Sequence, residues 1–322
     1  MPDPGSPYQI PGWLRRAATA LVTLLALTVA AIALRHIAAE TSWDRIAADI
    51  ARISPARLTV AAVLTIASYV TLIGYDALAL RVVGRRVDAG TTALASFTSY
   101  VFSHNFGFAT VTGGIARWRI YRPKGLTLGE VAQVMVMTGV TFWMGVFLIL
   151  GGAFVVATDP VTVLGVTVGA PHLHMVGAST LIALIGYTAL LHYRSGRTMS
   201  LFGWVVTLPT PRIAAAQFVL ATLDHVLAAA VVFTLMPAMP VSDFPFVLIA
   251  YLLALLAGLI THAPGGVGVF EVMMVMALPH LDRSALLASL LLYRLVYFLV
   301  PLAFGLALFA GHEWRMRNPT RS

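Results

Sequence analysis

Long apolar runs alternate with short polar stretches along the chain, and the lengths of these runs predict helices that cross a membrane. Six runs approach or exceed the roughly 20 residues that span a bilayer. They cover about residues 17–37, 58–83, 130–157, 173–192, 213–236 and 286–310. Transmembrane β-strands give short alternating segments instead. The pattern therefore predicts an all-α, polytopic membrane helix bundle with about six full spans.

A short amphipathic segment separates the first two predicted spans. Trp43, Ile46, Ile50 and Ile53 recur at helical spacing, with charged residues between them. Such a helix either lies in the membrane interface or serves as a solvated connector, and the sequence leaves both open.

Two further apolar regions are interrupted by glycines and polar residues. The first covers about 91–116 and contains SHNFGFATVTGG, and the second covers about 244–281 and contains THAPGGVGVFE. Non-helical backbone at membrane depth must be buried in protein or line a wet cavity. Each region therefore either crosses the membrane completely or enters it and returns to the same side as a re-entrant hairpin.

The positions of lysine and arginine distinguish these two topologies, because cytoplasmic loops are enriched in both residues. If both regions cross, the enrichment falls on the outer side. If both return, the cytoplasmic side holds positions 15, 16, 81, 85, 86, 117, 119, 122, 124, 194, 197, 212, 315, 317 and 321. The outer side then holds only positions 35, 45, 52, 57 and 283. We therefore expect two re-entrant hairpins, with both termini on the cytoplasmic side of a bacterial inner membrane.

This topology divides the chain into two halves with the same layout and opposite orientation. The halves cover about 13–157 and 172–310, and each contains two spans, a re-entrant segment and a further span. Interrupted segments at matching positions of inverted halves point to a substrate site near the bilayer midplane. We expect a single transmembrane domain over 1–322, without a soluble catalytic domain, in which the two breaks face each other or a shared cavity.

Composition supports a membrane protein and argues against several other classes. The chain is 59% hydrophobic and 11% charged, against about 25% charged residues in soluble domains. Its net charge of +8 comes from short clusters beside apolar runs, which favours a topology signal over nucleic-acid binding. The chain has no cysteine and no recognisable catalytic motif, so we expect no metal, no cofactor and no enzyme activity.

The candidate substrate-binding residues cluster at the two breaks. Backbone N–H groups and glycines at a helix start can hold a phosphate, and an arginine can add a bidentate contact. Alternatively, the glycines only permit a tight turn and close packing, and Arg117 is only a topology charge. The candidates are Asn105, Gly113, Gly114, Arg117, His262, Pro264, Gly265, Gly266, Gly268, Glu271 and Arg294.

Glu271, Arg294 and Asp224 are the ionisable residues most clearly within apolar helix. Such groups are costly in a membrane and usually face the bundle interior in pairs, so Glu271 should pair with Arg294 or Arg117. The pair either locks the re-entrant hairpin or coordinates a lipid head group. Asp224 beside His225 is either part of a proton relay or a partner in an interhelical hydrogen bond.

The second break and the last span resemble a known family. Residues 263–271, APGGVGVFE, resemble the PGG-x-G-x-x-E signature of the lysylphosphatidylglycerol synthase transmembrane family. Residues 105–125, 223–237 and 291–305 are similar to the family's earlier glycine-arginine block, its acidic span and its closing helix. The resemblance implies a membrane domain that moves phospholipids, aminoacylated ones included, between leaflets. The residues that it places along the lipid path are Arg117, Gly265, Gly266, Glu271 and Arg294.

The expected function is therefore that of an inner-membrane, flippase-like lipid translocase whose ligand is membrane phospholipid. Full-length resistance factors of this family also carry a synthase domain that the sequence lacks, so synthase activity is not expected. Two alternatives stay open: a non-transporting membrane partner of a separate lipid-modifying enzyme, and an intramembrane enzyme on a lipid or polyprenyl substrate. A second copy of the chain or a lipid-modifying enzyme is the candidate protein partner.

Overall fold

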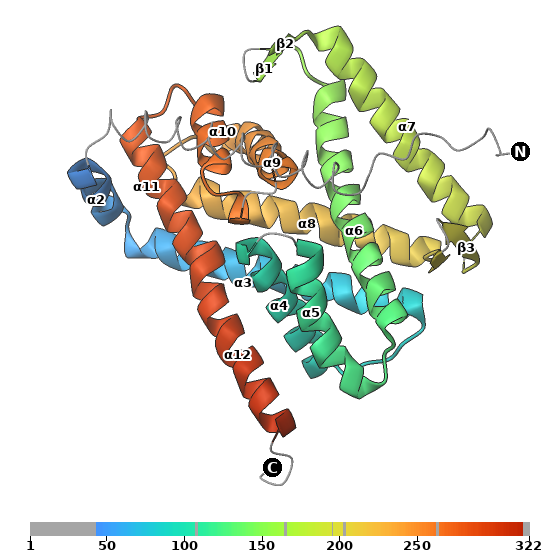
Figure 1. The fold of residues 1–322 in the computed structure, drawn as a ribbon. Coiled ribbons are helices and arrows are strands. Elements are labelled where there is room, and N and C mark those ends of the chain that lie inside the picture. The colour runs from blue at the N-terminus through green and yellow to red at the C-terminus, as the bar shows by residue number, and fades with distance from the viewer. Residues whose placement is uncertain are drawn as a thin grey trace, which may run out of the picture.

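The computed structural model describes residues 43–106, 109–163, 166–194, 196–201, 204–261 and 264–317. Helices make up nearly all of their regular structure, which confirms the predicted all-α class (Figure 1). The first predicted span, about 17–37, lies outside the described residues.

The first half of the described chain contains a short amphipathic helix followed by longer apolar ones. Its elements are α2 (Trp43–Arg52), α3 (Pro55–Val83), α4 (Ala89–Phe106), α5 (Ala109–Tyr121), the 3-10 turn η1 (Arg122–Lys124) and α6 (Leu128–Val155). Local sequence signals set several of these boundaries. Ser54 caps the start of α3 by accepting from the N–H of Arg57, and Gly84 ends that helix with a φ of 76°. Thr127 and Glu130 form a capping box at the start of α6.

The second half begins with two small hairpins on either side of a long helix. Its elements are β1 (Val161–Val163), β2 (Val166–Val168), α7 (Ala170–Arg194), β3 (Thr198–Leu201), β4 (Trp204–Thr207), α8 (Pro211–Leu235), the 3-10 turn η2 (Val241–Asp243), α9 (Phe244–Ile260), the 3-10 turn η3 (Pro264–Gly266), α10 (Val269–Ala277), α11 (Arg283–Tyr293), the π-helix η4 (Arg294–Leu299) and α12 (Val300–Arg317). Strand β1 pairs antiparallel with β2, and β3 pairs antiparallel with β4.

Six helical segments of the described chain are long and apolar enough to cross a membrane. They are Pro55–Val83, Leu128–Val155, Ala170–Arg194, Pro211–Leu235, Val241–Ile260 and Arg283–Met316. Five of these match predicted spans. The segment Val241–Ile260 belongs to the region that we expect to be re-entrant. Its length alone would also allow it to cross the membrane completely.

The centre of the bundle is the pair α3 and α8, which run across the middle of the view and pack along each other (Figure 1). Helix α6 packs against both. Each interrupted region is a pair of packed helices: α4 packs on α5, and α9 packs on α10. Helices α11 and α12, joined by η4, form one long rod that passes both pairs.

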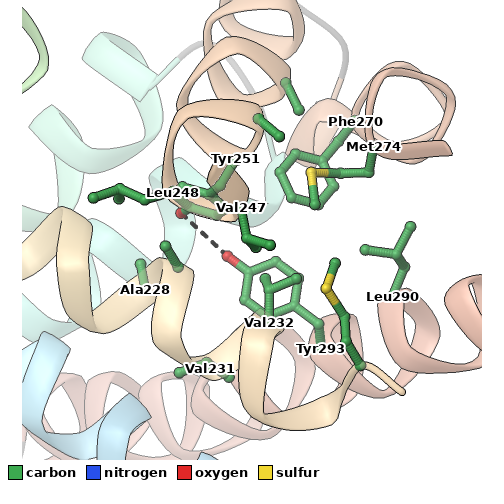
Figure 2. Packing of buried hydrophobic residues seen from close by; sticks show 14 of the residues in the cluster. Ala228, Val231, Val232, Val247, Leu248, Tyr251, Phe270, Met274, Leu290 and Tyr293 are labelled. Carbon is green, nitrogen blue, oxygen red and sulfur yellow. Dashed lines mark hydrogen bonds between the residues drawn. The ribbon is translucent and has the colours of Figure 1, made fainter. Parts of the chain in front are cut away.

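The largest apolar cluster joins α8, α9, α10 and α11. Figure 2 shows its interior, where Val232 of α8, Val247 of α9, Met274 of α10 and Leu290 of α11 surround the ring of Tyr293. The second interrupted region is thus held by side chains from both neighbouring long helices.

Helix α2 confirms the amphipathic helix predicted after the first span. Ile46 is buried in a cluster with Leu287 and Ala288 of α11, whereas Trp43 is exposed. The apolar face of this short helix therefore covers the beginning of the last long rod.

Candidate functional site

The second break is a tight turn built on glycines. Gly265, Gly266 and Gly268 have φ values of 60°, 65° and 82°, a region of backbone conformation that residues with a Cβ atom rarely adopt. A Cβ atom on Gly265 would also lie 3.2 Å from the carbonyl oxygen of His104, in the last turn of α4. The break predicted here is therefore present, and it lies directly against the end of the first interrupted helix.

Glu271 forms a buried ion pair with Arg294, one of the two partners expected from the sequence. Nε of Arg294 lies 2.8 Å from Oε1 of Glu271, and their side chains are 12% and 9% exposed. Nη1 of Arg294 donates to the carbonyl of Gly265. The backbone N–H of Gly268 donates to Oε2 of Glu271 at 2.7 Å. The pair therefore ties the turn and the start of α10 to η4.

This arrangement corrects one expectation about the turn. A backbone N–H group at the start of α10 was expected to be free for a phosphate, but Glu271 of the same helix already accepts from Gly268. The carboxylate takes the place at the helix start that an anionic ligand would otherwise occupy.

One donor of Arg294 has no partner among the described residues. Its Nη2 is buried and makes no hydrogen bond with any residue that the structure describes. The guanidinium lies over the rings of Phe298 and Phe270, at 4.8 and 5.3 Å from their centroids. Nδ1 of His104 is likewise buried without a partner in the described chain. The meeting point of the two interrupted regions thus holds a cation with an unused N–H donor.

The first glycine pair does not form the first break, contrary to the expectation. Gly113 and Gly114 lie inside α5, which begins at Ala109. A Cβ atom on Gly113 would lie 2.7 Å from Oγ of Ser99, which donates to the Gly113 carbonyl at 2.8 Å. A Cβ atom on Gly114 would lie 2.9 Å from Cε of Met135. These glycines therefore serve close helix packing, which was the alternative reading of the pair.

Arg117 pairs with a residue that the sequence analysis did not single out. Its Nε and Nη2 lie 3.0 and 2.8 Å from the two carboxylate oxygens of Asp76 in α3. The hydroxyl of Tyr121 donates to the same carboxylate, and the ring of Tyr100 lies under the guanidinium at 4.8 Å. Arg117 therefore does not pair with Glu271, because its planar fork is occupied by Asp76.

The remaining candidates at the breaks have structural contacts or fall outside the described chain. Nδ2 of Asn105 donates to the carbonyls of Val101 and Phe298, at 2.8 and 3.4 Å, and so connects the end of α4 to η4. Pro264 opens the η3 turn. His262 lies outside the described residues.

Asp224 makes interhelical hydrogen bonds with hydroxyl groups of α3. Oγ of Ser68 lies 2.7 Å from its Oδ1, and the hydroxyls of Thr71 and Tyr75 lie at 3.4 Å. Nε2 of His225 lies 3.2 Å from the carbonyl of Phe142 in α6. The structure thus shows the interhelical hydrogen bond that was one of the two readings of Asp224.

The comparison with known sequences adds the family. Residues 22–305 match the family described as the lysylphosphatidylglycerol synthase TM region. The chain belongs to this family. A relative from Synechocystis sp., named uncharacterized protein slr0712, is 31% identical over 263 residues, which are 81% of this chain and 80% of the relative. A relative from Escherichia coli, named inner membrane protein YbhN, is 28% identical over 306 residues, which are 92% of each chain.

Membership of the lysylphosphatidylglycerol synthase TM family and the apolar spans establish a membrane protein. The Pro-Gly-Gly signature that suggested this family forms the η3 turn, and its final glutamate is the residue that binds Arg294. The signature therefore encodes one local unit, a turn with its own helix cap, and its glutamate binds a cation that η4 supplies.

Sequence reasoning missed the acid that pairs with Arg117. Asp76 lies within the apolar run predicted to span at 58–83. The same argument that singled out Glu271, an ionisable residue within an apolar helix that needs a partner, therefore also applies to Asp76. Ser68 and Tyr297, which extend the hydrogen-bond network of Asp224, gave no such signal, because neutral hydroxyls are common in apolar helices. Among the described residues, no group of three His, Cys, Asp or Glu side chains is placed to hold a metal.

Proposed function

We propose that the protein is a bacterial inner-membrane lipid translocase that moves phospholipid between leaflets, with aminoacylated phospholipid among its candidate substrates. The observation that supports this most is Nη2 of Arg294, a buried cationic donor without a partner in the described chain. A head-group phosphate is an acceptor that matches a guanidinium. The family description, which names a lipid synthase, supports a lipid as the ligand. The proposal treats the protein as a transporter and not as an enzyme.

In this proposal, the protein contacts orient Arg294 toward the lipid. Glu271 holds Nε and the Gly265 carbonyl holds Nη1, so the guanidinium cannot turn freely and Nη2 is presented to the ligand. Because Gly265 has no side chain, the backbone of the turn can approach both the end of α4 and a head group closely. Movement of the two hairpins relative to each other would then expose the site to each leaflet in turn.

Contacts at one end of the bundle support a re-entrant path for α4 and α5. Arg119 after the first break pairs with Glu313 near the end of α12. Nζ of Lys124 lies 2.8 Å from Oδ2 of Asp88, which precedes α4, and the side-chain hydrogen bond from Lys124 holds the pKa of Asp88 well below its usual range. Both ends of this helix pair thus lie on the side where α12 ends, as expected for a hairpin that returns.

Contacts at the other end support the corresponding path for α9 and α10. Nε of Arg57, at the start of α3, donates to the carbonyl of Thr234 at 2.7 Å. Oγ of Ser289 in α11 donates to the carbonyl of Leu235 at 2.9 Å. The start of α3, the end of α8 and α11 therefore lie together, which supports a path in which α9 and α10 leave and rejoin the same side.

These contacts agree with two inverted halves. In this arrangement α8 corresponds to α3, the α9–α10 hairpin to the α4–α5 hairpin, and α11–α12 to α6. Arg119 and Lys124 lie at the end of the bundle where α12 ends. If this end faces the cytoplasm, as the positive charges favour, both termini lie on the cytoplasmic side in this proposal.

A reconstitution experiment tests the translocase proposal. Purified protein is placed in liposomes with a fluorescent phospholipid, and the fraction of label accessible to an external quencher is followed over time. We expect the wild type to move label between leaflets and Arg294→Lys to be much slower, because lysine keeps the charge but lacks the planar fork. Arg85→Gln, which changes an arginine far from the turn, is the matched control and should keep the wild-type rate. A wild type that moves no lipid would contradict the proposal.

A further inference from the structure

The buried charges of the described chain do not balance. Its buried carboxylates are Asp76, Glu271 and Asp224. Arg117 compensates the first and Arg294 the second. No arginine or lysine of the described residues forms an ion pair with Asp224. A carboxylate in an apolar bundle is costly unless it is paired or hydrogen-bonded, and the hydroxyls that donate to Asp224 bring no positive charge.

We propose that Asp224 is the site of a reversibly bound proton that is coupled to the movement of the second hairpin. Proton binding at this carboxyl stands independently of the proposed function, whereas its coupling to lipid movement rests on it.

The surroundings of Asp224 favour a proton over a metal ion. Its carboxylate is in direct contact with hydroxyl groups, the nearest being Oγ of Ser68 at 2.7 Å. A metal ion needs several oxygen ligands arranged around a vacant centre, and carboxylates usually dominate such sets. Here the ligating oxygens would be those of Ser68, Thr71 and Tyr75, which already face the carboxylate. A proton needs no added space, because it converts one oxygen of the carboxylate into a hydroxyl.

Ser68 can support both protonation states. With Asp224 ionised, the Ser68 hydroxyl donates to Oδ1 of the carboxylate. When the carboxylate takes up a proton, the new O–H group of Asp224 donates to Oγ of Ser68. The Ser68 hydrogen then turns to the hydroxyl of Tyr297, which lies 2.8 Å away and accepts in place of donating. The proton is thus stored as one O–H bond on Asp224, and no other group changes its charge.

The other titratable groups near Asp224 are mostly neutral phenols. His225 is its chain neighbour on α8, and it bonds the carbonyl of Phe142. Tyrosines of α3, α4, α9 and η4 lie close enough to sense the charge of the carboxylate: they are Tyr69, Tyr75, Tyr100, Tyr251 and Tyr297. None of these phenols supplies a positive charge, so a proton bound at Asp224 itself is the simplest neutralisation.

The π-helix η4 connects this proton site to Arg294. Tyr297, whose hydroxyl shares a hydrogen bond with Ser68, and Arg294, which holds the Pro-Gly-Gly turn, both belong to this six-residue segment. The ring of Tyr297 also stacks on His104, whose carbonyl faces Gly265. Short π-helical segments recur at functional sites, where they interrupt the regular helical ladder. A change in hydrogen bonding at Asp224 therefore acts on the same segment that positions the cation at the turn.

Infrared difference spectroscopy on the purified full-length protein tests proton binding without any transport assay. We expect a carboxylic-acid C=O band that decreases as the pH is raised from mildly acidic to alkaline, and that is absent in Asp224→Asn. Asp243→Asn, an acid-to-amide change at the start of α9 away from this network, is the matched control and should keep the band. Ser68→Ala should shift the frequency of the band, because the acid then loses its hydrogen-bond partner.

The outcomes separate this inference from the translocase proposal. A wild-type spectrum without an Asp224-dependent band, or with one that does not respond to pH, overturns proton binding whatever the liposome assay shows. If the band titrates, lipid movement is then measured with and without an imposed pH gradient. We expect a gradient to change the wild-type rate several-fold and to leave Asp224→Asn unaffected. Equal gradient responses of both proteins would overturn the coupling while leaving the proton site in place.

Discussion

At the scale of single residues, each buried acid of the described chain has a different set of hydrogen-bond partners. Glu271 accepts a hydrogen bond from Nε of Arg294, and Asp76 accepts from Nε and Nη2 of Arg117. Asp224 instead accepts from a hydroxyl group, that of Ser68. Ion pairs at such positions are sensitive to the loss of one partner, because the other charge is then left uncompensated. Substitutions at these residues should therefore have large and separable effects.

The Glu271–Arg294 pair should behave as a coupled unit in a double-mutant cycle. Glu271→Gln leaves a buried guanidinium without its counter-charge, a loss that typically costs about 3–5 kcal/mol. We expect a clear fall in the thermal unfolding midpoint of the detergent-solubilised protein. Combining Glu271→Gln with Arg294→Met should restore much of this loss, since no buried charge remains. A double variant as unstable as the sum of the two single variants would argue against direct coupling.

The buried and exposed ion pairs should differ strongly in their effect on stability. Asp76→Asn removes the carboxylate that faces a 5% exposed Arg117 side chain, so we expect a marked drop in the unfolding midpoint. Glu313→Gln removes the partner of Arg119, which is 49% exposed and well solvated, so we expect little change. Thermal unfolding of both variants under the same detergent conditions makes the comparison. Similar midpoints for the two variants would contradict the burial of the Asp76 pair.

At the scale of elements, the two interrupted regions are built from different chemistry. The α4–α5 pair relies on close packing, with Gly113 set against Ser99 and an ordinary helix around it. The α9–α10 pair relies on a tight turn in which Gly265 and Gly268 have positive φ, a conformation that glycine adopts readily. The same layout is thus reached once by helix packing and once by backbone conformation.

A pair of glycine substitutions tests the packing of α4 on α5. Gly113→Ala places a methyl group 2.7 Å from Oγ of Ser99 and also against Ser103, so the two helices must separate. Overpacking of this kind costs about 1–3 kcal/mol. Gly139→Ala in α6 is the matched control, because nothing lies within 4 Å of its added Cβ. There alanine should stabilise the helix by about 0.5–1 kcal/mol. Thermal unfolding midpoints should therefore move in opposite directions.

At the scale of the whole molecule, the ends of the α4–α5 pair and the ends of the α9–α10 pair lie next to different ends of the long helices. The ends of α4–α5 lie near the end of α12, where Arg119 meets Glu313. The ends of α9–α10 lie near the start of α3, where Arg57 meets the end of α8. In a membrane, this separation would place the ends of the two pairs at opposite surfaces, as the proposed alternating access between inverted halves requires.

Site-directed labelling tests this topology, since the chain has no cysteine of its own. Arg122→Cys and Ser242→Cys both place a thiol at exposed positions, next to the first and second hairpins. With re-entrant hairpins, a membrane-impermeant maleimide added to intact cells should label position 242 and not position 122. Labelling after permeabilisation confirms that both thiols react. The reverse pattern in intact cells would mean that both regions cross the membrane.

The sequence by itself determined the helical class and limited the expected partner of Glu271 to Arg294 or Arg117. Run length and the scarcity of charge reveal spans, and an ionisable residue in such a run must find a partner. Only the tertiary structure decided that Arg117 belongs to Asp76, that Gly113 lies within a helix, and that Asp224 is held by hydroxyls of α3. These outcomes depend on which helices pack together. The length of an apolar run and the residues of a turn can be read directly from the sequence. A contact between two distant segments leaves no such local signal in either of them.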